Sequence, residues 1–185
     1  VTPTHMVPQI LEALPEAIEG GLRVPLVYNC GGYEEVDTLR LLEGIFDVYM
    51  PDFKFWDAKE AARFCSAADY REKACAAVKE MHRQVGDLAL DQEGIAQSGL
   101  LIRHLVMPDG LAGTREIMRF LANEVSRETY VNVMGQYRPC GEAHEFPELR
   151  RSITVEEYRD AVTMAQEEGI HRLDERKLSR LFQWV

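Results

Sequence analysis

A regular alternation of short apolar runs with segments of helical periodicity constrains this chain more than any other feature. Runs that are hydrophobic throughout are typical of strands buried on both faces of a parallel sheet. Strands are expected at residues 24–29, 45–50, 100–107 and 129–134, and Val1–Thr4 has the composition of a strand end. Helices are expected at residues 8–19, 34–43, 57–85 with a break near Ala68 and Asp69, 115–126, and from Thr154 onward.

This order predicts a parallel sheet covered by helices, and two architectures satisfy it: an open doubly wound sheet and a β/α barrel. In both, the active site lies at the carboxyl ends of the strands. Two helix starts carry capping residues. Thr114 is expected to cap helix 115–126, and Thr154, with Glu157 three residues later, fits a capping box for the last long helix.

The composition of the chain limits which classes of protein it can belong to. The 185 residues suit one large domain, and the 46% hydrophobic content can supply a sizeable core. The net charge of -10 argues against non-specific binding to nucleic acids or anionic membranes. No apolar run approaches the roughly 20 residues of a membrane helix. The cysteines lie far apart and without a C-x2-C pair, which favours reduced thiols and a cytoplasmic location: Cys30, Cys65, Cys75 and Cys140.

Polar residues gather at the ends of the predicted strands. Asp52 and Lys54 are two positions apart, which places both side chains on one face of an extended strand end. A neighbouring carboxylate and ammonium suit a zwitterionic ligand such as an amino acid, and an ordinary ion pair explains the spacing equally well. Arg103 lies inside an apolar run, where a charge is costly unless it is paired or faces a wet cavity, so a ligand role is favoured.

Two histidines also lie near these strand ends. His104 points away from Arg103 in a regular strand, which favours a buried structural histidine. His5, after Thr-Pro-Thr, either caps a helix or contacts a ligand. No pair of His and Cys has zinc-ligand spacing, and no phosphate-binding loop or nucleophile elbow is present in the sequence.

Taken together, these strand ends resemble a known family. The stretches VTPTH, VYNCGGY, DVYMPDFK, IRHLVMPDGLAGT and QYRPCGEAHEFPELRRSIT are similar to those of radical S-adenosylmethionine proteins related to pyruvate-formate-lyase-activating enzyme. The resemblance runs from Val1 to about Gly169. It implies a mostly parallel, partial (β/α)6 barrel of the TIM type. It also implies an iron-sulfur cluster of the [4Fe-4S] type, bound by three cysteines spaced C-x3-C-x2-C after the first strand.

The family's activity and partners follow from the same resemblance. Reductive cleavage of S-adenosylmethionine yields a 5′-deoxyadenosyl radical, which in true activases abstracts hydrogen from a glycine of a partner glycyl radical enzyme. A flavodoxin-like protein is the implied electron donor. Lys54, Asp52 and Arg103 would carry the active site. The positions implied to contact the cosubstrate are Thr4, His5, Asn29, Cys30, Asp52, Lys54, Arg103, Gln136 and Tyr137.

The resemblance also places residues 1–170 as strands two to six of the barrel, truncated at the N-terminus, with 171–185 as a charged tail. The cluster-binding strand would precede Val1, so no metal ligand is expected in this chain and the chain alone is expected to be inert. Two other classes remain open. One is a β/α-barrel lyase or aldolase with Lys54 as Schiff-base former, and the other is a non-catalytic binding domain.

Overall fold

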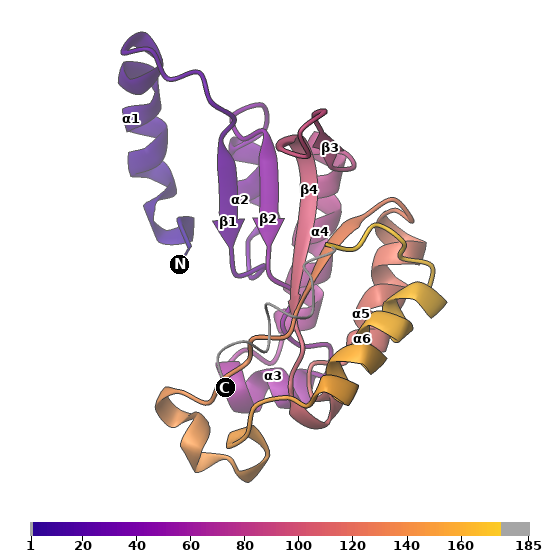
Figure 1. Ribbon diagram of the computed structural model, residues 1–185. Helices are drawn as coiled ribbons and strands as arrows, with labels where there is room; N and C mark the ends of the chain where they lie inside the picture. Colours follow the sequence, from indigo (N-terminus) through magenta and orange to yellow (C-terminus); the bar gives the residue numbers. More distant parts are fainter. Residues whose placement is uncertain (1, 175–185) are drawn as a thin grey trace.

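The computed structural model describes residues 2–174, which form helices packed around a five-stranded sheet (Figure 1). The helices are α1 (Val7–Glu19), α2 (Val36–Leu41), α3 (Ala58–Cys65), α4 (Tyr70–Val85), α5 (Thr114–Phe120) and α6 (Val155–Glu167). The strands are β1 (Val27–Cys30), β2 (Val48–Pro51), β3 (Ala89–Leu90), β4 (Ala96–Leu105) and β5 (Tyr130–Met134). Short helical turns are η1 (Thr4–Met6), η2 (Pro108–Gly110), η3 (Leu121–Val125, a π turn), η4 (Gly141–Glu145) and η5 (Pro147–Leu149).

Four strands run parallel and lie side by side in chain order, β1, β2, β4 and β5, while β3 pairs antiparallel with the start of β4. The chain after α6 returns along the other side of β5. There the Val131 amide donates to the Arg172 carbonyl (2.9 Å) and Val131 O accepts from the Asp174 amide (3.1 Å). The predicted α/β class with a mostly parallel sheet is therefore confirmed.

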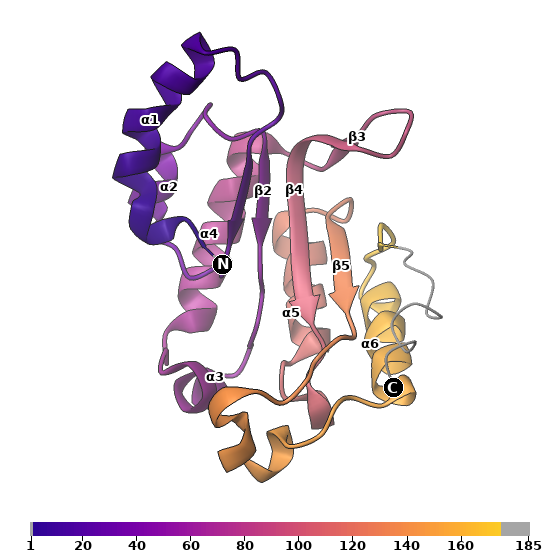
Figure 2. The ribbon, with the colours of Figure 1, turned by 60° about the vertical axis from the view of Figure 1, so that its left-hand side comes forward.

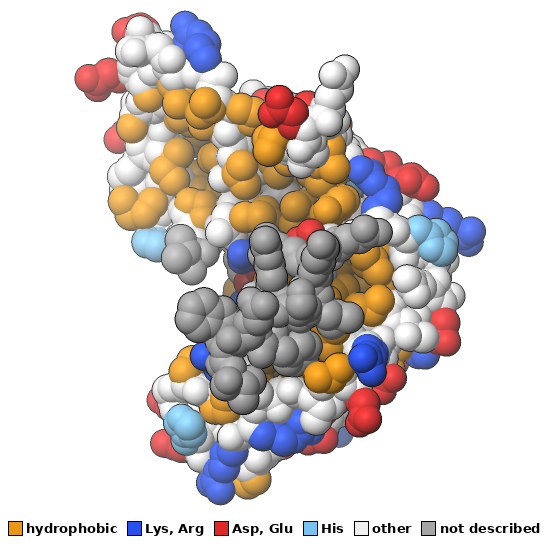
Figure 3. Space-filling view, viewed as in Figure 1, with side chains coloured by type: hydrophobic (Ala, Val, Ile, Leu, Met, Phe, Trp, Pro, Cys, Tyr) orange, Lys and Arg blue, Asp and Glu red, His pale blue; other side chains and the backbone are white. Residues whose placement is uncertain are grey.

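The two faces of the sheet are covered unequally. The strand residues that point to one face are almost completely buried, among them Tyr28, Tyr49, Ile102 and Val131. Residues that point to the other face, such as Leu101 and Asn132, keep partial exposure. The helix α4 contacts β2, β4 and α2, and α5 packs against α6. Figure 3 shows apolar side chains spread over the less covered side.

The carboxyl ends of the parallel strands all point to one edge of the molecule. In Figures 1 and 2 the segment containing η4 and η5 lies beyond the arrowheads of β4 and β5, next to α3. In both views α1 lies at the β1 end of the sheet. In the part of the chain that the structure describes, no helix is long and apolar enough to cross a membrane.

Several predicted details are confirmed. The long helical region 57–85 is broken between α3 and α4, where Ser66 takes a left-handed conformation (φ 55°). Asp57, which was not predicted as a cap, caps α3 by accepting from the Lys59 and Glu60 amides. Thr154 and Glu157 form the predicted capping box at the start of α6.

Other expectations were wrong. Thr2–Thr4 form no strand end, because Thr4 opens a helical turn that leads directly into α1; Val1 lies outside the described residues. Thr114 does not cap α5. The N-cap is Gly113, in the left-handed region (φ 73°), where a Cβ would lie 2.7 Å from Trp56 Cβ.

The ends of the sheet also differ from the sequence-based boundaries. The β3–β4 hairpin was not predicted, because Gln97, Ser98 and Gly99 interrupt the apolar pattern at the start of β4. The expected tail begins within a paired segment, since Leu173 forms a bridge with Val131. The rest of that tail, residues 175–185, lies outside the described residues.

Candidate functional site

Three of the predicted site residues form one ion cluster at the carboxyl ends of β2 and β4. The carboxylate of Asp52 pairs with Lys54 through Oδ2 (2.7 Å to Nζ) and with Arg103 through Oδ1 (2.6 Å to Nη2). Their side chains are 16%, 42% and 25% exposed, in the order Asp52, Lys54 and Arg103. The structure therefore brings these three residues together in one ion cluster, and we call them the strand-end triad.

Backbone pairing fixes the triad in place. The Asp52 amide donates to Cys30 O (2.9 Å), and the Phe53 amide donates to Arg103 O (2.8 Å), so the chain after β2 stays bound to both neighbouring strands. The Tyr70 hydroxyl, from the start of α4, accepts from the Lys54 amide (2.9 Å) and lies 3.1 Å from Asp52 O. The triad is consequently held by the sheet and by α4 rather than by a free loop.

A close approach between two loops explains the glycine pair after β1. Gly32 has φ 77°, and a Cβ there would lie 2.1 Å from Asp52 O. The Tyr70 hydroxyl also contacts Gly31 O (3.0 Å). The backbone of these glycines therefore packs against the protein's own triad-bearing segment, and glycine is required at Gly32 for both its conformation and the space.

The triad carries an excess of one positive charge, because a single carboxylate pairs with two cations. Three buried polar atoms here form no hydrogen bond among the described residues: Arg103 Nε, Asn29 Oδ1, and Asp52 Oδ1, whose contact with Arg103 is an ion pair only. Asn29 pairs in register with Met50, two residues before Asp52, so it lies on the same face of the sheet. A buried polar group without a partner costs about 1–3 kcal/mol. The site thus offers both a donor and an acceptor to a ligand.

His104 behaves as predicted. It lies on the helix-covered face, where Nδ1 is 2.9 Å from Phe53 O and Nε2 is 2.9 Å from Thr114 Oγ1. Complete burial lowers the pKa of His104 to about 4, so the ring is neutral near pH 7. A neutral ring donates from Nδ1 to Phe53 O and accepts the Thr114 hydroxyl proton at Nε2. His104 therefore holds the backbone of Phe53, between Asp52 and Lys54, from the helix-covered face of the sheet.

Two cavities flank the triad, and each is lined by one of its two cations. A cavity of about 270 Å³ is lined by Arg103 and by the side chains of Met50, Asn132, Val133, Met134, Gln136 and Tyr158. We call it the amide cavity, after Asn132 and Gln136. A second cavity, of about 370 Å³, is lined by Lys54 and by Phe55, Arg63, Phe64, Ser66, Leu105, Met107, Tyr137, Cys140, Glu142, Ala143, Phe146 and Leu149. We call it the aromatic cavity.

The structure separates the remaining predicted residues. Gln136 shares the amide cavity with Arg103, and Tyr137 lines the aromatic cavity, where its hydroxyl donates to Leu149 O (2.9 Å). The thiol of Cys30 does not join the triad, because Cys30 is fully buried with Tyr28 on the helix-covered face. Burial raises the pKa of that thiol. His5 is exposed on the turn η1.

A buried carboxyl group that the sequence did not single out lies close to Cys30. Glu34 accepts from the Thr4 hydroxyl (2.5 Å) and from the Tyr28 hydroxyl (3.3 Å), and burial raises its pKa. The hydroxyl of Thr4 is thereby held near the end of β1, where it donates its proton to Glu34. Nothing in the sequence indicates this role, because Glu34 begins a stretch that reads as an ordinary amphipathic helix.

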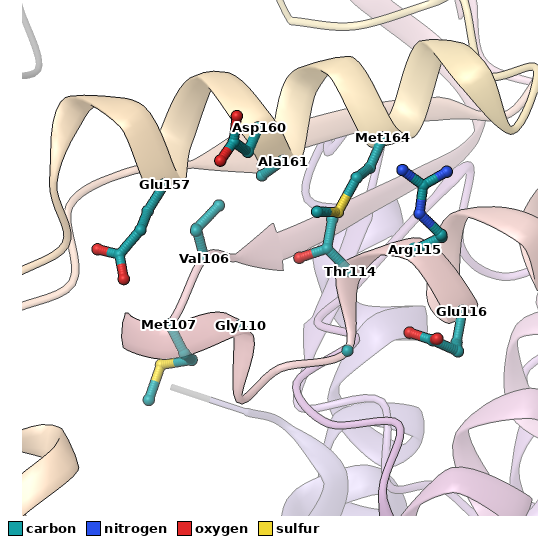
Figure 4. A pocket seen from close by; sticks show the side chains of 11 residues that line it. Val106, Met107, Gly110, Thr114, Arg115, Glu116, Glu157, Asp160, Ala161 and Met164 are labelled. Carbon is teal, nitrogen blue, oxygen red and sulfur yellow. The ribbon is translucent and has the colours of Figure 1, made fainter.

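A further cavity, of about 320 Å³, lies outside the sheet between α5 and α6 (Figure 4). Two of its four charged lining residues, Arg115 and Glu157, are engaged in ion pairs. Glu157 binds Arg151 and accepts from two backbone amides, and Arg115 pairs with Glu167 and Glu168. These pairs join loops and helices to one another, which is a structural role. We therefore place the candidate site at the strand-end triad.

Comparison with known proteins adds a relative but no assigned activity. No protein-family model matches the chain. The uncharacterized protein MJ0674 of Methanocaldococcus jannaschii is 33% identical over 160 residues, which cover 86% of this chain and 43% of that protein. The chain therefore spans less than half the length of this relative.

Proposed function

We propose that the strand-end triad binds the amino-acid end of S-adenosylmethionine, in a protein of the radical S-adenosylmethionine type. The observation that carries the proposal is the carboxylate of Asp52 held between two cations, with contacts of 2.7 Å and 2.6 Å. A zwitterion can exchange partners with such a cluster without leaving a charge unpaired. Its carboxylate would bind Lys54 and Arg103, and its ammonium group would bind Asp52 and Asn29 Oδ1.

The amide cavity supports the same assignment for the rest of the molecule. Arg103 faces this cavity together with the side-chain amides of Asn132 and Gln136. Amides can both donate to and accept from the hydroxyls of a ribose and the edge of an adenine. These residues would therefore orient the nucleoside, while Arg103 joins the nucleoside side of the site to the amino-acid side.

The proposed architecture is a partial β/α barrel of the TIM type. Two features support it over a doubly wound sheet. The parallel strands follow one another in chain order, and the fully buried strand residues lie on a single face. In a barrel that covered face turns outward toward the helices, and the other face turns inward toward the site. A ligand above the triad would then lie at the barrel mouth.

The iron-sulfur cluster of the resembled family does not fit the described residues. Such a cluster needs three thiolates that converge. Across residues 2–174 no three His, Cys, Asp or Glu side chains are grouped so that they could hold a metal ion. Cys30 is buried behind the sheet, whereas Cys65 and Cys140 are exposed on different elements. We therefore derive no step through a cluster, and the function proposed for these residues is binding and orientation of the cosubstrate.

For the whole protein, the resemblance supplies the chemistry and the partners as part of the proposal. In that family the bound cosubstrate is cleaved reductively and supports hydrogen-atom abstraction from a glycine of a partner enzyme, with electrons from a flavodoxin-like donor. The contribution of this chain would be to hold the amino-acid end with Lys54 and Arg103 and to keep bulk water from the nucleoside in the amide cavity.

Isothermal titration calorimetry with S-adenosylmethionine tests the binding function. Each charge-assisted hydrogen bond contributes roughly 1.5–3 kcal/mol, so Lys54→Ala should weaken binding by about tenfold to a hundredfold. Lys79→Ala is the matched control, because Lys79 forms an exposed ion pair with Glu124 far from the triad. Equal dissociation constants for the Lys54→Ala variant and the wild type would remove Lys54 from the site.

One observation favours a second candidate, a Schiff-base lyase or aldolase. Lys54 lines a cavity with phenylalanine walls, and a Schiff-base lysine needs such surroundings. Against it, Nζ of Lys54 already donates to Asp52, and the side chain is 42% exposed. Reduction with borohydride in the presence of small aldehydes should leave Lys54 unmodified. A covalent adduct on Lys54 would favour the lyase instead.

A further inference from the structure

The aromatic cavity lies next to the triad but differs from the amide cavity in chemistry. Its walls include Phe55, Phe64, Phe146 and Leu149, and Lys54 stands at its border with the triad. Phenylalanine and leucine side chains offer no hydrogen bonds, so they favour an apolar ligand over a sugar or a phosphate. The triad therefore lies between an amide-lined cavity and a cavity with aromatic and aliphatic walls, whose other lining residues include Arg63, Ser66 and Glu142.

A helix and a loop segment that both line the aromatic cavity contact each other. Arg63 of α3 forms an ion pair with Glu148 of η5, and its guanidinium carbon lies 5.0 Å from the ring centre of Phe64 and 5.2 Å from that of Phe146. The rings of Phe64 and Phe146 meet edge to face, with centres 5.2 Å apart and planes at 88°. We call this contact between α3 and the η4–η5 segment the loop latch.

The η4–η5 segment is held in place from its own side as well. The Tyr137 hydroxyl donates to Leu149 O (2.9 Å), and Arg150 Nε donates to His144 O (2.7 Å). The latch therefore joins two parts of the cavity lining. An extended peptide needs a groove along its length, whereas a cavity of about 370 Å³ suits one compact group.

We propose that the aromatic cavity binds an uncharged aromatic or branched aliphatic group of a small-molecule substrate. That this group belongs to a substrate rests on the proposed function, in which the cosubstrate occupies the amide cavity on the other side of the triad. That the cavity binds an apolar group is independent of the proposed function. Lys54 and Asp52 lie between the two compartments, so the apolar group would be held next to the reacting end of the cosubstrate. This assignment departs from the protein substrate that the family resemblance implies.

Two exposed cysteines provide a direct test with indole as the probe. Cys140 lines the aromatic cavity, and Cys65 is exposed on α3 but does not line the cavity. Alkylation by iodoacetamide, followed by peptide mass spectrometry, reports both thiols in one sample. A pocket buries most of its ligand's surface, so saturating indole should slow alkylation of Cys140 by about threefold to tenfold. The rate at Cys65 should stay unchanged.

A filled cavity should remove this protection. Ala143 is half-buried in the lining, and Ala143→Phe places a ring where indole would bind. Ala62→Phe is the matched control, because Ala62 is an exposed residue of α3 outside the lining. Indole should still protect Cys140 in the Ala62→Phe variant and should fail to do so in the Ala143→Phe variant.

Three results would overturn the inference. Equal rates with and without indole in the wild type would show that the cavity binds no such group. Equal protection of Cys65 would show non-specific binding. Protection of Cys140 by an unstructured, phenylalanine-containing peptide at a lower concentration than indole would indicate a protein substrate instead of a small molecule. Calorimetry with S-adenosylmethionine on the same protein separates the two proposals, because each ligand has its own cavity and readout.

Discussion

Arg103 and Asp52 come from different strands, yet the guanidinium Nη2 and the carboxylate Oδ1 lie 2.6 Å apart on the less covered face of the sheet. The same carboxylate binds Lys54 through its other oxygen. Asp52 is therefore the only anion of the triad, and the positions of both cations depend on it.

Replacing Asp52 by Asn tests this dependence. The change keeps the shape of the side chain but leaves Lys54 and Arg103 without their common counter-charge. The two cations are partly exposed, so solvent screens part of the cost, and the free energy of unfolding should fall by roughly 1–3 kcal/mol. Urea denaturation monitored by circular dichroism measures the change.

Asp37→Asn is the control for this experiment. Asp37 pairs with Arg40 on the surface of α2, and its side chain is 93% exposed. Its replacement should change stability less than that of Asp52, because exposed pairs contribute little. Similar losses of unfolding free energy in the two variants would show that the ion pairs of the triad stabilise the fold no more than an ordinary surface pair does.

Gly32→Ala and Gly44→Ala form a matched pair of changes. Both glycines have φ 77°, so a side chain costs about 1–2 kcal/mol in backbone strain at either position. At Gly44 nothing lies within 4 Å of the added Cβ, whereas at Gly32 Asp52 O lies at 2.1 Å. Gly32→Ala should therefore destabilise the fold clearly more than Gly44→Ala, by denaturant titration. Equal losses would show that the loop after β1 does not pack on the triad as described.

His104 should make stability depend on pH between about 6.5 and 4. Its pKa in the folded protein is about 4, below the 6.5 of a free histidine. Between these two pH values His104 is protonated in the unfolded chain and neutral in the folded chain. Stability present above pH 6.5 is therefore lost as pH falls toward 4. The shift corresponds to about 3 kcal/mol. Glu34, whose pKa is raised, acts in the opposite direction and offsets part of this loss.

Comparison of variants isolates the histidine. His104→Gln should be less stable than the wild type at pH 7, and its stability should fall less between pH 7 and pH 5. His144→Gln is the matched control, because it makes the same exchange at an exposed residue of η4. The acids Glu80 and Glu157 have pKa values of about 2 in the folded protein, below the ordinary 4.5, so the stability they add is lost mainly below pH 4.5 and changes little between pH 7 and pH 5. A wild-type slope retained in His104→Gln would contradict this account.

The sequence predicted the parts of the fold that depend on local pattern. Apolar runs located the four parallel strands, and the break before Asp69 and the capping box at Thr154 were correct. The triad could be predicted because strand ends meet at one edge of a parallel sheet. Which face each residue occupies was harder to predict, since a shift of one residue reverses the face. Cys30 and Asn29 are adjacent but lie on opposite faces for this reason.

The cavities could not be predicted from the sequence. The loop latch joins Arg63 to Glu148 and to Phe146, and these residues lie in segments with no shared periodicity. Thr114 was assigned as a helix cap from its local position, but a distant contact decides its role, the hydrogen bond to His104. Glu34 likewise depends on contacts with Thr4 and Tyr28 that only the folded chain brings together.

Calorimetry with S-adenosylmethionine and 5′-methylthioadenosine tests the central claim most directly, because the second ligand keeps the nucleoside and lacks the amino-acid end. The wild type should prefer S-adenosylmethionine, and Arg103→Ala should reduce that preference by about tenfold to a hundredfold, as expected for one charge-assisted hydrogen bond. The affinity for 5′-methylthioadenosine should change much less. Equal affinities for the two ligands in the wild type, or a preference that Arg103→Ala leaves intact, would contradict the claim that the strand-end triad binds the amino-acid end.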